Sequence, residues 1–65
     1  MYSVFLVNFG YTHSTYPTLE QAIAGAERTG FQCSIFREGD TDFKVLKWVC
    51  PVQGKKGRKV NYVYS

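Results

Sequence analysis

The chain has 65 residues, so it can hold only one small hydrophobic core, because a domain of this size buries about 60 % of its unfolded surface. Its 45 % apolar and 17 % aromatic content excludes a disordered chain. The net charge of +3 is unevenly distributed: residues 1–42 carry five acids and two arginines, a net −3, whereas residues 43–65 carry six lysines and arginines and no acid, a net +6. Blocks of one sign usually mark an interacting surface.

The apolar N-terminal run and the two cysteines indicate the location and the redox state of the protein. The apolar run at residues 1–8 has no basic leader and is too short for a signal peptide or a membrane span, so we expect a cytoplasmic protein. Cys33 and Cys50 form no C-x-x-C pair and are too few for a disulfide framework. We expect two buried free thiols on neighbouring strands, with a disulfide between them as the alternative.

The first predicted elements are strands. Residues 2–9 are rich in β-branched and aromatic side chains and are apolar on both alternating faces, which predicts an inner strand. Gly10 ends this run. The aromatic and hydroxyl-rich residues 11–16 predict a short edge strand or an ordered loop.

A helix is predicted over residues 19–29. Pro17 disfavours helix before it, and Thr18 with Gln21 forms a capping box. Gly30 suits the left-handed position that ends a helix. Gly25 costs about 1 kcal/mol inside a helix relative to Ala, and we attribute it to a strip of small residues that lets the helix lie close on a sheet whose aromatic side chains fill the space.

The remaining elements form a meander of three strands. Residues 31–37 and 43–50 alternate as half-buried strands on either side of a polar turn at 38–42, and Pro51 should lie on an edge or at a bulge. A basic hairpin loop at 53–59 leads to a last strand at 60–64. The whole predicts a single α+β domain over residues 1–65, with one helix on one face of a small, mainly antiparallel sheet of four or five strands in the order β(β)αβββ.

Catalysis and metal binding find little support in the residues. The only histidine, His13, stands among hydroxyl residues and has no nucleophile and base beside it. The acids Glu38, Asp40 and Asp42 lack the later bidentate glutamate of a calcium loop, so we interpret them as a solvated turn. No glycine-rich phosphate motif is present. We therefore expect a protein that is not an enzyme and holds no cofactor and no metal.

The strongest functional signal is the basic hairpin. Its four cations could contact several phosphates, and nearby rings could stack on bases. Alternatively, the loop serves solubility and keeps an edge strand from pairing, or binds an acidic protein. The candidate partner-binding residues are Lys47, Trp48, Lys55, Lys56, Arg58, Lys59, Tyr62 and Tyr64.

The second signal is a surplus of aromatic side chains. One helix covers one face of a sheet, so we expect Tyr2, Leu6, Phe36 and Trp48 on the other face, exposed or covered by a second subunit. The alternative is a strongly twisted sheet that buries most of these side chains.

Four segments resemble small hypothetical proteins of phages and prophage regions, which often read N-F-G-Y, T-L-E-E-A, T-G-F and W-S-P-I-G-G in that order. The corresponding segments here are residues 7–11, 16–22, 29–31 and 48–54, and the chain departs at Val49-Cys50 and in its longer basic hairpin. The resemblance implies a fold and a source. It carries over no site residues, and it implies the activity common among such proteins, which is to occlude a host machine such as a transcription complex or a CRISPR effector.

Three hypotheses follow. The first is a phage-type accessory protein that modulates or inhibits a host protein or nucleoprotein complex through the basic hairpin and an aromatic sheet face. The second is weakly specific DNA or RNA binding. The third is a homodimer joined through sheet faces or an edge strand. No membrane partner is expected.

Overall fold

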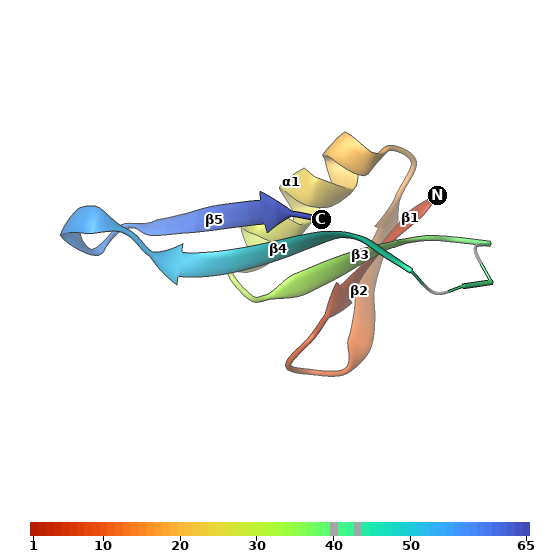
Figure 1. Ribbon diagram of the computed structural model, residues 1–65, viewed down its shortest axis with the longest axis horizontal. Coiled ribbons are helices and arrows are strands. Elements are labelled where there is room, and N and C mark those ends of the chain that lie inside the picture. The colour runs from red at the N-terminus through yellow and green to blue at the C-terminus, as the bar shows by residue number, and fades with distance from the viewer. Residues whose placement is uncertain (40, 43) are drawn as a thin grey trace.

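The fold is a five-stranded antiparallel sheet with one helix on one face (Figure 1). The computed structural model describes residues 1–39, 41–42 and 44–65, and of Lys55 only the backbone. The elements in chain order are β1 (Tyr2–Leu6), β2 (Tyr11–Tyr16), α1 (Leu19–Thr29), β3 (Cys33–Arg37), β4 (Val45–Gln53), a 3-10 turn η1 (Lys55–Gly57) and β5 (Lys59–Tyr64). The strands lie in the order β2-β1-β3-β4-β5. The predicted α+β class is confirmed.

Helix α1 begins and ends where its capping residues predict. The Thr18 hydroxyl accepts a hydrogen bond from the backbone N–H of Gln21 at 3.2 Å, which satisfies one of the free donors of the first turn. Gly30 adopts φ 74°, and its N–H donates to the Glu27 carbonyl. These local interactions explain why the helix could be placed from sequence.

The hydrophobic core lies between α1 and one face of the sheet. Side chains on β1, β3 and β4 meet the small residues of the helix there, and the buried apolar set is Val4, Leu6, Ala22, Ala26, Cys33, Ile35 and Val49. Tyr2 packs against this core from the side. The expectation that Tyr2 and Leu6 lie on the uncovered face is therefore wrong, whereas Phe36 and Trp48 do lie there. Both faces of β1 are apolar, so its alternation could not indicate which one the helix covers.

Gly25 is the point of closest approach between α1 and the sheet. Gly25 is buried, and a Cβ atom built on it would fall on the phenol end of the Tyr16 side chain. Tyr16, the last residue of β2, fills the space that the missing side chain leaves. The strip of small residues predicted from sequence thus has a specific partner, and the interpretation of Gly25 as a packing residue is confirmed.

Replacing Gly25 tests this contact. We expect Gly25→Ala to lower the free energy of unfolding by about 1–3 kcal/mol, because overpacking against Tyr16 outweighs the gain in helix propensity. In a Tyr16→Ala background the sign reverses, and Gly25→Ala stabilises by about 1 kcal/mol. Urea unfolding followed by circular dichroism measures both steps. Ala24→Gly on the exposed face of α1 is the control, with a loss of about 1 kcal/mol in either background.

Several strand boundaries differ from the prediction: β3 begins at Cys33 and not at Phe31, and β5 begins at Lys59 and not at Val60. β1 ends at Leu6 and not at Phe9, because the N–H groups of Phe9 and Gly10 both donate to the Leu6 carbonyl and close a turn. β4 continues through Pro51 to Gln53. β3 begins at Cys33, which lies opposite Val49, so it does not reach Pro51. Pro51 therefore pairs only with β5, and the predicted edge position is confirmed at this point of an otherwise inner strand.

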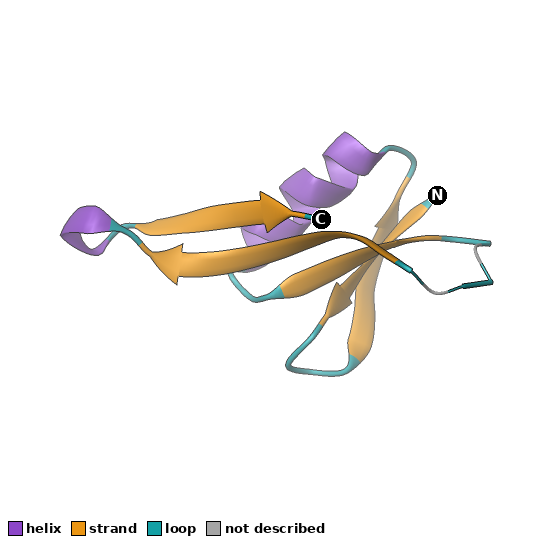
Figure 2. Cartoon of the chain, viewed as in Figure 1, coloured by secondary structure: helices purple, strands orange, loops and turns teal. Residues whose placement is uncertain are grey.

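The β4–β5 hairpin extends beyond the rest of the sheet, with the short 3-10 turn at its far end (Figure 2). It makes the molecule elongated, with extents of 41 × 22 × 19 Å. The connection between β3 and β4 lies at the opposite end of the long axis (Figure 1). The predicted turn at 38–42 belongs to this connection; Asp40 and Phe43 lie outside the described residues.

Candidate binding surfaces

The face of the sheet that α1 does not cover, called here the open face, carries a row of paired residues across four strands. Phe5 of β1 pairs with Ser34 of β3, Ser34 with Trp48 of β4, and Trp48 with Tyr64 of β5. Paired residues of antiparallel strands point to the same face. The open face therefore presents the rings of Phe5, Phe36, Trp48, Tyr62 and Tyr64.

The rings in the middle of the open face shield the sheet beneath them. Phe5 and Phe36 meet edge to face with centroids 6.3 Å apart, and both are half-buried. Ser34, which lies between Phe5 and Trp48, is only 2 % exposed. The central rings are themselves half-buried, so the alternative of a sheet that buries its own rings holds there only in part.

The rings on β5 are exposed. β5 is an edge strand, and Tyr62 and Tyr64 are 62 % and 49 % exposed. Val60 shares their face and is also exposed. The expectation of an exposed aromatic surface therefore holds at this edge of the sheet.

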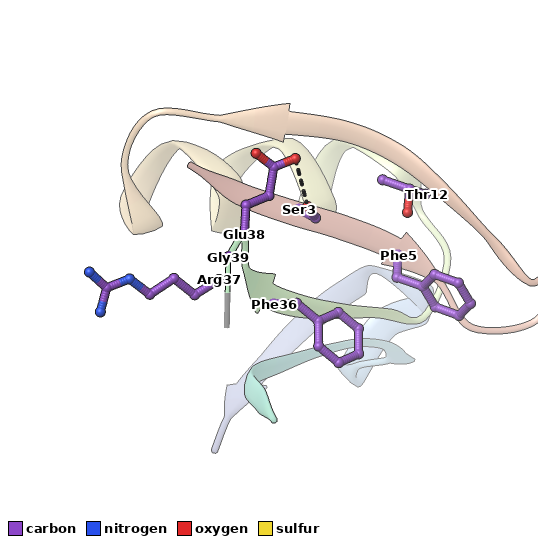
Figure 3. Close-up of a pocket in the computed structure, with 7 residues that line it drawn as sticks. All are labelled: Ser3, Phe5, Thr12, Phe36, Arg37, Glu38 and Gly39. Carbon is purple, nitrogen blue, oxygen red and sulfur yellow. Dashed lines mark hydrogen bonds between the residues drawn. The ribbon is translucent and has the colours of Figure 1, made fainter. Parts of the chain in front are cut away.

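A shallow hollow of about 470 Å³ lies at the other end of the open face (Figure 3). Phe5 and Phe36 line it with residues of β1, β2 and the end of β3. The Ser3 hydroxyl donates to the Glu38 carboxylate at 3.5 Å, and the Arg37 side chain extends away from the two rings (Figure 3). The hollow is thus mainly apolar, and two of its polar side chains, Ser3 and Glu38, contact each other.

The basic residues lie at the end of the hairpin and on its other side. Lys56 and Arg58 are exposed in the connection 54–58, called here the tip. Lys47 pairs with Ile35, and Lys59 pairs with Gln53, so both point to the side of the sheet that carries α1. The structure therefore brings the predicted rings Trp48, Tyr62 and Tyr64 together but does not place Lys47 or Lys59 beside them; the side chain of Lys55 is outside the description.

The tip is a tight turn. The Gly54 N–H donates to the Arg58 carbonyl at 2.6 Å, and Lys56 adopts φ 63°, in the left-handed region that favours glycine. Glu38 and Asp42 lie in the β3–β4 connection at the far end of the molecule. Lys56, Arg58 and Lys59 thus lie at one end of the long axis, whereas Lys44 precedes β4 beside the β3–β4 connection at the opposite end.

The two cysteines point to opposite faces of the sheet. Cys33 is buried beneath α1, where its sulfur lies 3.4 Å from the Thr29 hydroxyl, and it pairs with Val49, the neighbour of Cys50. Both thiols are free and lie on neighbouring strands, as predicted, but Cys50 is only half-buried. Their opposite directions exclude the disulfide alternative within this fold.

Cys50 instead contacts Tyr64 on the open face. The Cys50 sulfur and the Tyr64 hydroxyl oxygen are 3.6 Å apart. This hydrogen bond, with a smaller contribution from desolvation, raises the pKa of Tyr64 above its ordinary value of 10.0, because it favours the protonated phenol.

Titration of Tyr64 checks this contact. We expect its phenol to ionise at higher pH than an ordinary tyrosine, and Cys50→Ala to lower its pKa towards 10.0. The ¹³Cζ chemical shift of Tyr64, followed by NMR from pH 8 to 12, reports the change directly. Cys33→Ala, which removes the thiol on the opposite face of the sheet, is the matched control and should leave the Tyr64 titration unchanged. An unchanged Tyr64 titration in Cys50→Ala would contradict the hydrogen bond.

Sequence reasoning missed an exposed aromatic cluster formed by Phe9, Tyr11 and Phe31. The Phe9 ring lies 5.0 Å from that of Phe31 and 6.3 Å from that of Tyr11, and all three side chains are about half exposed. Phe9 and Phe31 were predicted inside strands, but each lies in a turn beside a glycine with positive φ. Aromatic residues that flank turn glycines were the available signal.

Within the described residues, no three His, Cys, Asp or Glu side chains are grouped so that they could hold a metal ion. None of the helical segments described is both long and apolar enough to cross a bilayer. Comparison of the chain with family models, curated proteins and solved structures finds no match.

Proposed function

We propose that this chain is a non-enzymatic accessory protein of phage type, which binds a host macromolecular machine and modulates or inhibits it. The binding surface is the β5 side of the open face, with the basic tip beside it. The observation that carries the proposal is the exposure of Tyr62 and Tyr64 on an edge strand, 62 % and 49 %.

The β5 surface has the composition of an interface centre. Tyrosine and tryptophan are enriched among the residues that contribute most to protein binding, and Trp48 pairs directly with Tyr64. Val60 extends the apolar surface along the strand. Because no strand of the described sheet pairs with the outer side of β5, its backbone N–H and C=O groups are also available to a partner.

The tip contributes electrostatic attraction. Lys56 and Arg58 are exposed at the end of the hairpin, and residues 43–65 contain no acid. A concentrated positive charge speeds encounter with an acidic protein or a nucleoprotein, and its effect falls with salt. A host nucleoprotein, such as a transcription complex or a CRISPR effector, is the class of partner that matches both this charge and the resemblance to small phage proteins.

The test is affinity purification from bacterial lysate with matched tyrosine variants. We expect the wild-type protein to recover a specific complex, and Tyr62→Ser with Tyr64→Ser to lose it at least tenfold, because the exposed rings dominate the contact. His13→Ser is the control, since His13 is exposed on β2, the other edge strand of the sheet, and belongs to neither proposed surface. Quantitative mass spectrometry measures the recovered complex.

Two results would contradict the proposal. One is recovery of the same proteins by wild type and by the double variant, with both folded by circular dichroism. The other is a wild-type dimer that the double variant converts to a monomer in sedimentation, because β5 would then serve self-association.

A further inference from the structure

The aromatic cluster of Phe9, Tyr11 and Phe31 is exposed without a covering element. Its rings are 54 %, 53 % and 47 % exposed and lie in contact with one another. Phe9 and Phe31 meet edge to face, at 87° between their planes. Three contiguous exposed rings on so small a domain indicate a binding surface.

The cluster adjoins a hollow that contains a lysine. Phe31 lines a hollow of about 330 Å³ with Pro51 and Lys59, and the other lining residues are Gly30, Val52 and Gln53. This volume lies within the range of small-molecule pockets. The hollow lies where the turn after α1 meets the tip end of the β4–β5 hairpin, at the last residues of β4 and the first residue of β5, and none of its lining residues is acidic.

This surface combines rings and cations, which the open face does not. Pairing with Gln53 directs Lys59 to the α1 side of the hairpin, where it lines the same hollow as Phe31. Arg58 directly precedes Lys59, Lys56 lies two residues before Arg58 in the tip, and both are exposed. A ligand that lies on the aromatic cluster can therefore extend along a series of cations.

We propose that this surface binds single-stranded nucleic acid, with bases stacked on the aromatic cluster and in the hollow, and with phosphates on Lys59, Arg58 and Lys56. Exposed rings beside a basic groove are the common means of binding single strands without strong sequence preference. The Gln53 amide, which offers a donor and an acceptor at the rim of the hollow, can contact the edge of one base. The site uses other rings than the proposed protein interface and goes beyond that function.

A single strand fits these features better than a duplex or an acidic protein. The bases of a duplex are stacked on one another, so the rings would gain no contact from it. An acidic peptide offers charge but few planar groups for the rings and the apolar floor of Phe31 and Pro51. The observation that decides between them is that one hollow is lined both by Phe31, a ring of the aromatic cluster, and by Lys59.

The experiment measures the affinity of the full chain for a labelled single strand of twelve thymidine nucleotides, by fluorescence anisotropy at several salt concentrations. Phe31→Ala should weaken binding by about five- to a hundredfold, as expected for the loss of one stacked base. The three described cations predict a slope of log K against log salt of about −2, and Lys59→Gln should reduce it by about 0.7.

Three further variants serve as controls. Tyr62→Ser removes an exposed tyrosine from the open face and should leave the affinity unchanged. Lys56→Gly and Lys56→Ala remove the same charge, but only glycine accepts the left-handed backbone at this position. Equal losses of affinity in these two variants show a charge effect, and thermal unfolding confirms that each variant is folded.

The outcomes separate this inference from the proposed function. Three results would overturn the nucleic-acid site. The first is absence of binding at 50 mM salt, and the second is equal binding of duplex and single strand with no effect of Phe31→Ala. The third is competition by polyglutamate as good as that by the single strand. None of these results depends on Tyr62 or Tyr64, so the proposed protein interface is tested separately, by the affinity purification. Loss of single-strand binding in Tyr62→Ser would also overturn the nucleic-acid site at the hollow, because it would place that site on the open face.

Discussion

The contact between Tyr16 and Gly25 fixes how the only helix of the described chain lies on the sheet. Because Gly25 has no side chain, Tyr16 can pack beneath α1 while Ala22 and Ala26 reach the aliphatic residues of β1 and β3. The helix thereby covers the inner strands closely. It leaves the other face and the outer part of the hairpin uncovered, and the binding surfaces lie on these uncovered parts.

A second consequence concerns where the aromatic residues go. None of the aromatic side chains that the structure describes is fully buried, and the core is made of small and aliphatic side chains. The helix lies close to the sheet and is rich in alanine, so Tyr2 and Tyr16 pack against the core but are only partly buried. The other described rings shield the centre of the open face, stand exposed on β5, or gather at the turns beside Gly10 and Gly30.

The hairpin divides these rings by side. Alternation along β5 directs Tyr62 and Tyr64 to the open face and Lys59 to the opposite side. Two surfaces of different chemistry thus lie back to back on one hairpin. One is aromatic and suited to a protein, and the other combines Phe31 with cations and suits a nucleic acid. Both surfaces would serve the nucleoprotein partner that we propose.

The sequence by itself determined the elements that local interactions specify. The capping residues Thr18 and Gly30 defined the helix, alternation defined the strands, and the +6 charge of residues 43–65 identified the basic hairpin. Only the tertiary structure decided which face of β1 the helix covers, because both faces are apolar and the choice depends on neighbours distant in sequence. For the same reason the strand register, which separates Lys47 and Lys59 from Trp48, Tyr62 and Tyr64 and joins Phe31 to Lys59, could not be deduced from the residues alone.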